Sequence, residues 1–222
     1  MLQAMVAAAE RVFEFLEQPE EIETAKGEID TSKIKGNVEF KHVNFGYDED
    51  KTIINDFSAN IKEGQKIAIV GPTGAGKTTM VKLLMRFYDV NSGEINIDGH
   101  NIKDFKRGEL RKMFGMVLQD TWLFGGTVKE NIKYGNEEAT DGEVIEAAKA
   151  AHVHHFIKTL PKGYNSILNE ESSNVSAGQK QLLTIARVIL ANPKILILDE
   201  ATSSIDTRTE IQIQKAMDNL MK

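Results

Sequence analysis

Three shortages limit what this chain can be. It contains no cysteine, which excludes a disulfide framework and a zinc site built on thiolates. No stretch reaches the roughly 18 consecutive apolar residues that a membrane-spanning helix needs, and no signal-peptide pattern opens the chain. Acidic residues outnumber basic ones, 33 to 27, and the net charge of −6 argues against general affinity for nucleic acid or anionic membranes. We expect a soluble polypeptide that binds anions only at local sites.

The beginning of the chain differs from the rest. Apolar side chains recur at helical spacing over residues 1–16, and Pro19 ends the pattern. Residues 20–36 are charged and short of large apolar side chains, which predicts a linker with little need of a core. The remaining residues, from 37 to 222, are enough for one large globular domain, since 41% of the chain is hydrophobic.

Two strand patterns, at residues 38–45 and 52–61, open this domain and predict an antiparallel sheet. Tyr47 stands at the end of the first. Its ring fits either the core or a platform for a nucleotide base, and its position alone favours the core, because most aromatic side chains are buried.

The most informative stretch is the glycine-rich loop at residues 71–79. An apolar run at 67–70 predicts a strand leading into it, and a helical pattern over 80–87 leads out of it, as in a P-loop. The glycines let backbone N–H groups curl toward an anion at a helix N-terminus. We predict that Lys77 contacts the β and γ phosphates of a nucleoside triphosphate and that the Thr78 hydroxyl binds its Mg²⁺. The candidate phosphate-binding residues are Gly71, Pro72, Thr73, Gly74, Ala75, Gly76, Lys77, Thr78 and Thr79.

Further strands are predicted at 94–99 and 114–118. The second ends at Gln119, where an open α/β sheet places ligand-contacting groups, although a plain strand-to-loop boundary explains Gln119 equally well. Residues 127–189 are almost entirely helical in pattern, which predicts a helical subdomain inserted between strands. Three histidines cluster at 152–155, but no acidic or cysteine residue has metal-ligand spacing to them, so a metal site is not predicted there.

Ser176 precedes a helical run at 180–190, and Gln179, three residues later, completes a capping-box pattern. This is either a plain helix cap or a second helix N-terminus that offers N–H groups to a phosphate, and the spacing does not decide between them.

The apolar run at 195–198 predicts a central parallel strand covered on both faces. It ends in Asp199 and Glu200. Beside a P-loop, such a pair predicts a ligand of the Mg²⁺ shell, Asp199, and a carboxylate that polarises an attacking water, Glu200.

In their order and spacing these elements resemble the nucleotide-binding domain of ATP-binding cassette (ABC) transporters, from about residue 37 to the end of the chain. The resemblance implies an α/β fold: a P-loop NTPase core with an antiparallel β subdomain and an inserted helical subdomain at about 121–190. It implies ATP and Mg²⁺ as cofactors. It assigns adenine stacking to Tyr47 and a role in γ-phosphate sensing and Mg²⁺ binding, the Q-loop role, to Gln119.

The same resemblance assigns the later motifs. Residues 175–179 match the family's signature motif, in which Ser176, Gly178 and Gln179 contact the nucleotide of a partner domain. Asp199 ends the Walker B motif, Glu200 is the catalytic carboxylate, and residues 203–206 form the D-loop. This domain would therefore pair head to tail with a second, identical or different, nucleotide-binding domain.

Residues 123–132 look like the segment after the Q-loop in exporters of the multidrug and lipid-flippase type. Residues 1–36 look like the helix and linker that leave the last membrane helix of such an exporter. The resemblance thus predicts an ATPase that powers export, with transmembrane domains as partners, at the cytoplasmic face of the membrane, and without nucleic acid. The alternative is a soluble ABC-type ATPase of translation or DNA repair; a P-loop kinase is disfavoured because nothing resembles an acceptor site.

Three features depart from the family pattern. Val175 and Ala177 stand where the signature has leucine and glycine, which leaves homodimer and heterodimer both open. Residues 169–172 keep only the glutamate of the exporter sequence Gly-Glu-Arg-Gly. The family's switch histidine follows the D-loop, whereas all five histidines here lie upstream, so we expect the chain to stop before that histidine.

Overall fold

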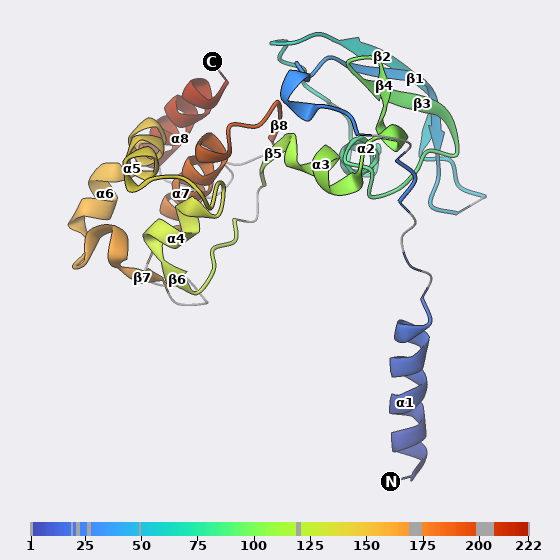
Figure 1. Ribbon diagram of the computed structural model, residues 1–222, viewed down its shortest axis with the longest axis horizontal. Coiled ribbons are helices and arrows are strands. Elements are labelled where there is room, and N and C mark those ends of the chain that lie inside the picture. The colour runs from blue at the N-terminus through green and yellow to red at the C-terminus, as the bar shows by residue number, and fades with distance from the viewer. Residues whose placement is uncertain are drawn as a thin grey trace.

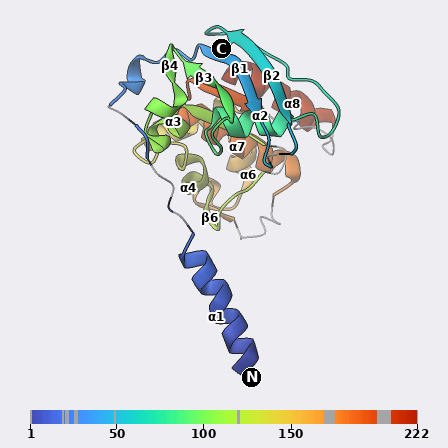
Figure 2. The ribbon, with the colours of Figure 1, turned by 90° about the vertical axis from the view of Figure 1, so that its right-hand side faces the viewer.

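The computed structural model describes residues 2–18, 20, 23–25, 28–48, 50–118, 121–168, 175–198 and 207–221. Two lobes make up the body of the protein, one around a sheet and one of helices (Figure 1). A short pair of parallel strands lies between them, and the N-terminal helix extends away from both (Figures 1 and 2). The mixed α/β architecture, with an antiparallel sheet and a separate helical part, agrees with the fold class predicted from the sequence.

The sheet lobe contains four antiparallel strands in the order β2-β1-β3-β4. In this sheet, Val38 of β1 lies opposite Ile61 of β2 on one side and opposite Ile97 of β3 on the other. Alternate side chains of these strands form an apolar core with two helices, α2 and α3. The elements are β1 (Val38–Phe45), β2 (Ile54–Ile61), α2 (Lys77–Leu84), β3 (Ser92–Ile97), β4 (His100–Asn101), the 3₁₀ turn η2 (Ile102–Asp104) and α3 (Arg107–Lys112). The predicted antiparallel pair is confirmed.

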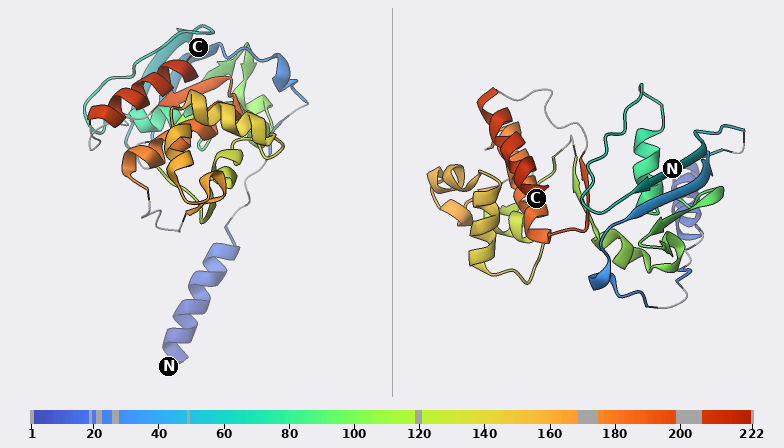
Figure 3. Two further views of the ribbon diagram at one scale, coloured as in Figure 1. Left: turned by 90° about the vertical axis from the view of Figure 1, so that its left-hand side faces the viewer. Right: turned by 90° about the horizontal axis from the view of Figure 1, so that it is seen from above.

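The helical lobe is built around α7, whose Leu182, Leu183 and Ile185 are buried among the other helices (Figure 3). Three of its helices begin with complete capping boxes, at Thr127, Thr140 and Ser176. The elements are β6 (Gly126–Thr127), α4 (Val128–Lys133), α5 (Asp141–Ala150), α6 (His154–Thr159), the 3₁₀ turn η3 (Gly163–Asn165), β7 (Ile167–Leu168), α7 (Ala177–Ala191) and α8 (Thr207–Leu220). The helices expected over 127–189 are present, but a two-stranded β6-β7 pair interrupts them, and α8 packs into the same core.

Two parallel strands, β5 (Phe114–Val117) and β8 (Ile195–Leu198), pair with each other between the lobes. A glycine allows α7 and the segment before β8 to pack closely on β5: a Cβ at Gly115 would stand 2.5 Å from Pro193 Cγ and 2.7 Å from Val188 Cγ1. Helices α4 to α7 all lie between these strands in the sequence, which is the insertion that the helical pattern predicted.

The strand expected at 67–70 does not form. Residues 65–72 have no regular secondary structure, and Ile67, Ile69 and Val70 are exposed, Val70 by 87%. A strand is stabilised by pairing, and in the described part of the chain β5 and β8 pair only with each other. Because β8 pairs only with β5 among the described residues, it is not covered on both faces as expected. Its side chains are partly buried, and Leu198 is 41% exposed.

Helix α1 (Leu2–Leu16) has the predicted extent, and its apolar side chains, including Phe13 and Phe15, are exposed. No helix among the described residues is long and apolar enough to span a bilayer. The linker, however, is more than a spacer. After the 3₁₀ turn η1 (Thr31–Lys33), Ile34 is buried in the core of the sheet lobe, although the sequence predicted a linker with little need of a core.

Candidate functional site

The glycine-rich loop leads into α2 as the sequence predicts. Gly74 and Gly76 have φ values of 85° and 86°, which L-residues with side chains rarely adopt. Gly76 also lies where a Cβ would come within 2.8 Å of Ile54 Cδ1. The loop is closed by Ala75 N–H donating to Pro72 O (3.1 Å), and Met80 N–H donates to Gly76 O (2.8 Å) in the first turn of α2. The loop therefore ends at a helix N-terminus, where N–H groups and the helix dipole favour an anion.

Lys77 is the first residue of α2, and its side chain folds back over the loop. Its ammonium donates to Gly71 O at 2.6 Å and to Pro72 O at 3.2 Å. The cation thus lies over the loop that we expect to hold phosphates. Because neutral carbonyls are weaker partners than phosphate oxygens, a bound triphosphate would draw this ammonium to itself.

Two threonines follow Lys77, and they differ in exposure. Thr78 is exposed, so its hydroxyl is accessible to a metal ion, while Thr79 is buried. The Thr79 hydroxyl lies 3.3 Å from the Tyr47 hydroxyl. Tyr47 itself is 43% exposed and is not part of the apolar core, which its position alone had favoured. Its ring lies beside the P-loop helix, near Thr79 and Lys82.

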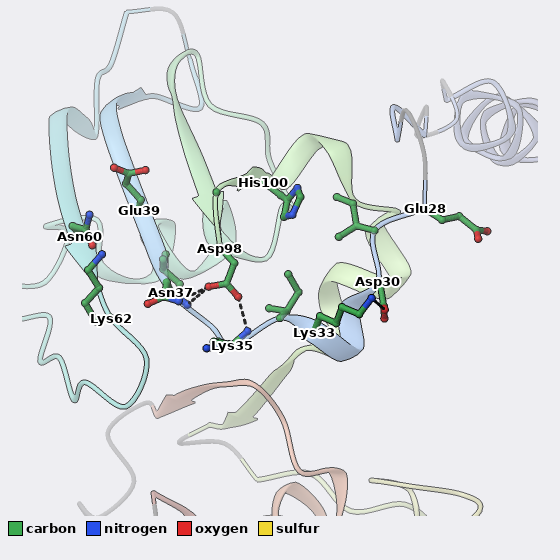
Figure 4. A pocket seen from close by; sticks show the side chains of 14 residues that line it. Glu28, Asp30, Lys33, Lys35, Asn37, Glu39, Asn60, Lys62, Asp98 and His100 are labelled. Atoms are coloured by element: carbon green, nitrogen blue, oxygen red, sulfur yellow. Dashed lines mark hydrogen bonds and ion pairs between the residues drawn. The ribbon is translucent and has the colours of Figure 1, made fainter.

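A hollow of about 240 Å³ borders the loop, between β2 and the start of α2, and its lining includes Ala75, Gly76, Lys77 and Met80. A larger cavity of about 730 Å³ lies elsewhere, between the linker and the sheet (Figure 4). Its lining mixes lysines, carboxylates and amides, and Asp98 inside it accepts from linker N–H groups. Of these two hollows, the smaller is the one bordered by the glycine-rich loop and by Lys77 at the start of α2.

The capping box at the start of α7 is confirmed. Ser176 Oγ accepts from Gln179 N–H at 3.3 Å, and Gln179 Oε1 accepts from Ser176 N–H at 2.9 Å. Gly178 lies in the first turn and is buried. These residues belong to the helical lobe, whereas Lys77 belongs to the sheet lobe, so the structure does not bring the two motifs together within one chain (Figures 1 and 3).

The remaining predicted site residues follow the two parallel strands. Val117, at the end of β5, is opposite Leu198, at the end of β8, so the carboxyl ends of both strands meet at one edge. Gln119, Asp199 and Glu200 come directly after these strands in sequence and lie outside the described residues, as does the D-loop at 203–206.

One residue of the histidine cluster has a side-chain partner within the helical lobe. His154 Nδ1 lies 2.8 Å from the Tyr164 hydroxyl, within the helical lobe. Burial, with a smaller contribution from Glu146, raises the pKa of Tyr164 to about 12. Nowhere in the described part of the chain do three histidine, cysteine or acidic side chains gather in a way that would hold a metal ion.

The helical lobe carries an aromatic cluster that none of the sequence motifs predicted. Trp122, Phe124 and Tyr134 contact one another through Phe124, with ring centroids 4.4 Å apart in each pair. Arg187 of α7 stacks on two of these rings and donates to Trp122 O (3.3 Å) and Asn131 O (2.9 Å). Burial lowers the pKa of this guanidinium. Trp122 and Tyr134 nevertheless remain exposed, and large exposed aromatic side chains that lie together are typical of interaction surfaces.

Comparison with known proteins identifies the family. The sequence model of the ABC transporter family matches residues 54–203, about two thirds of the chain. The chain belongs to the ABC transporter family. Its likeness extends to whole proteins: it is 54% identical over 221 residues to the fatty acid ABC transporter ATP-binding/permease protein of Mycobacterium bovis, covering 100% of the chain and 35% of that protein. It is 52% identical to the uncharacterized ABC transporter ATP-binding protein YfiC of Bacillus subtilis, covering 98% of the chain and 36% of the relative.

A solved structure agrees with this assignment. The ABC domain matches a bacterial Atm1-family ABC exporter with ATP bound, with a TM-score of 0.83 and 39% identity, over 99% of the chain and 38% of the exporter. The prediction of an exporter-type ABC ATP-binding domain, a family that hydrolyses ATP, is therefore confirmed, and the soluble alternative is not supported. The chain spans little more than a third of the length of these relatives.

Proposed function

We propose that this ABC domain binds and hydrolyses ATP to power export by a membrane transporter, at the cytoplasmic face of the membrane. The observation that carries the proposal is the P-loop: two glycines at positive φ, a helix N-terminus behind them and the Lys77 ammonium over the loop. The triphosphate would lie on the loop, with Lys77 against the β and γ phosphates and adenine against Tyr47. The loop residues Gly71 to Thr79 are the proposed phosphate cradle.

The residues proposed to bind Mg²⁺ have the chemistry that this ion requires. Mg²⁺ prefers oxygen ligands, which the exposed Thr78 hydroxyl, the Gln119 amide and the Asp199 carboxylate provide. When bound there, it would neutralise charge on the β and γ phosphates. Glu200 is the proposed general base: its carboxylate takes a proton from water as the water oxygen bonds to the γ phosphorus, the bond to the bridging oxygen breaks, and ADP leaves.

A second nucleotide-binding domain completes the site in this proposal. Ser176, Gly178 and Gln179 lie in the helical lobe, away from the P-loop of their own chain (Figure 3). A head-to-tail partner would place its own capped α7 N-terminus against the γ phosphate. Ala177 adds one methyl group beside that N-terminus.

The transmembrane domains are the other proposed partner. The exposed rings of Trp122 and Tyr134, held in place by Arg187, provide an apolar surface on the helical lobe. Gln119, three residues before Trp122, is proposed to sense the γ phosphate, so a membrane domain that docks here would be coupled to the nucleotide. The Mycobacterium bovis relative is an ATP-binding/permease protein and the matched structure is an ABC exporter, which supports this arrangement.

Two variants test the proposal by separating binding from hydrolysis. Lys77→Ala removes charge-assisted hydrogen bonds and should weaken ATP binding about ten- to hundredfold in titration calorimetry. Lys112→Ala, which removes the same charge from an exposed position on α3, is the matched control and should bind normally. Glu200→Gln should bind Mg-ATP like the wild type but turn it over very slowly in the assembled transporter. ATP binding that survives Lys77→Ala unchanged would contradict the P-loop assignment, and wild-type turnover in Glu200→Gln would contradict its role as base.

A further inference from the structure

Tyr47 is held by neighbours that the motifs do not assign. The ring of Tyr88, which follows α2, meets the ring of Tyr47 edge to face, with centroids 5.0 Å apart and planes at 82°. Phe45 packs against both, at 5.1 Å from Tyr47 and 5.8 Å from Tyr88. Perpendicular aromatic pairs at this separation are attractive beyond the area they bury. The three rings therefore form one cluster at the edge of the sheet lobe.

A cation joins this cluster from α2. Lys82 Nζ lies 5.6 Å from the centroid of the Tyr47 ring and 6.0 Å from that of Tyr88, within the range of a cation–π contact. Neither ring is enclosed, since Tyr47 and Tyr88 are each 43% exposed. A half-exposed tyrosine outside a core would ordinarily sample several rotamers. Here Tyr88 and Lys82 restrict the ring of Tyr47 on the side of α2.

The same helix carries the phosphate end of the site. Lys77 begins α2, Thr79 contacts the Tyr47 hydroxyl at 3.3 Å, and Lys82 lies one turn further along. Two residues that contact Tyr47, Thr79 and Lys82, thus lie on the same helix as Lys77. A platform fixed before the ligand arrives loses less conformational entropy on binding, and this raises affinity.

We propose that Tyr88 and Lys82 are positioning residues of the nucleotide base: they hold the ring of Tyr47 ready to stack on a purine. This rests on the proposed function and deepens it, because the ligand in question is the base of the same ATP. Tyr88 and Lys82 act through Tyr47, so their effect depends on the presence of both the Tyr47 ring and a base.

The test compares ATP with inorganic tripolyphosphate, a probe that has the phosphates but no base, by calorimetry on the full chain. Tyr88→Leu should weaken ATP about two- to tenfold, the range for one aromatic pair, and leave tripolyphosphate unchanged. Tyr88→Phe keeps the ring and should bind ATP as the wild type does. Lys82→Met keeps the stem without the cation and should weaken ATP by a smaller factor than Tyr88→Leu. Phe15→Leu, an exposed aromatic of α1, is the control for losing a ring elsewhere.

A double-mutant cycle with Tyr47→Leu supplies the decisive result. The double variant Tyr47→Leu/Tyr88→Leu should bind ATP no more weakly than Tyr47→Leu alone, because Tyr88 has then nothing to position. Additive losses would overturn the proposal, as would equal weakening of ATP and tripolyphosphate by Tyr88→Leu, which would indicate a general loss of folded structure. Failure of the wild type to bind either ligand would instead contradict the proposed function itself.

Discussion

We expect the side chain of Arg86 to contribute strongly to the stability of the sheet lobe. It follows α2, is fully buried, and has a φ of 54°, which is unfavourable for a residue with a side chain. Its guanidinium donates to Asp89 Oδ1 (3.0 Å), Thr24 Oγ1 (2.6 Å), and the backbone carbonyls of Lys103 (3.3 Å) and Phe105 (3.4 Å). We predict that Arg86→Met, which keeps most of the apolar stem, lowers the free energy of unfolding.

The magnitude follows from what each acceptor loses. Phe105 O loses a buried donor, which costs about 1 to 3 kcal/mol for an unsatisfied group. Lys103 O still accepts from Thr24 Oγ1 at 3.0 Å, and Asp89, 40% exposed, is hydrated instead, so these losses are smaller. Because burial of the Arg86 guanidinium costs desolvation free energy, its removal offsets part of the lost stability. We therefore expect a net loss of about 2 to 4 kcal/mol, below the upper range for a broken buried ion pair.

Urea denaturation followed by circular dichroism measures this change. With a slope of about 2 to 3 kcal/mol per molar urea, the midpoint should fall by about 1 M. Arg11→Met on the exposed surface of α1 removes the same charge and should leave the midpoint unchanged. A variant Arg86→Met as stable as the wild type would show that desolvation of the guanidinium cancels its hydrogen bonds, and the reasoning would be refuted.

Two further predictions concern packing and pH. Gly115→Ala should cost about 1 to 3 kcal/mol by overpacking against Pro193 and Val188, whereas Gly108→Ala on α3, where a Cβ meets nothing within 4 Å, should change stability by less than about 1 kcal/mol in the same urea assay. Burial alone would raise the pKa of Asp98, but hydrogen bonds from the Asn37 side chain and from three linker N–H groups outweigh it and lower the pKa. Because the folded pKa is the lower one, the carboxylate stabilises the fold above its ordinary pKa of about 4, and this stabilisation is lost as pH falls through the lowered value. Asp98→Asn should therefore be less stable than the wild type at pH 7, with a difference that shrinks below pH of about 4; a constant difference would contradict the charge argument.

Local patterns predicted the elements that depend on local contacts. The extent of α1, the β1-β2 pair and the capping box of Ser176 and Gln179 are confirmed, because a helical stripe, alternating strands and a cap are each recorded within a few consecutive residues. The P-loop belongs to this class as well, since its glycines and Lys77 are contiguous and their positive φ values follow from residue type.

Features that depend on distant partners were not predicted. The apolar run at 67–70 reads as a strand, yet a strand forms only where another edge pairs with it. Tyr88 and Lys82 carry no motif, and their contact with Tyr47 joins residues about 40 positions apart in sequence. Arg86 reads as an ordinary surface arginine at the end of a helix, and only its acceptors, contributed by the linker and by residues 89–105, explain its burial.

The contacts of the linker show that it is anchored to the folded domain. Its charged composition suggested a solvated spacer, but Thr24 binds buried Arg86, Glu23 accepts from Arg107 N–H at 3.1 Å, and Asp98 holds the backbone at 35–37. A charged segment can therefore be anchored by hydrogen bonds to the folded domain, which its composition alone does not reveal. Arg86 follows the same helix that begins with Lys77. The linker residue Thr24 therefore contacts the chain just after α2, whereas the glycine-rich loop lies just before the same helix of eight residues.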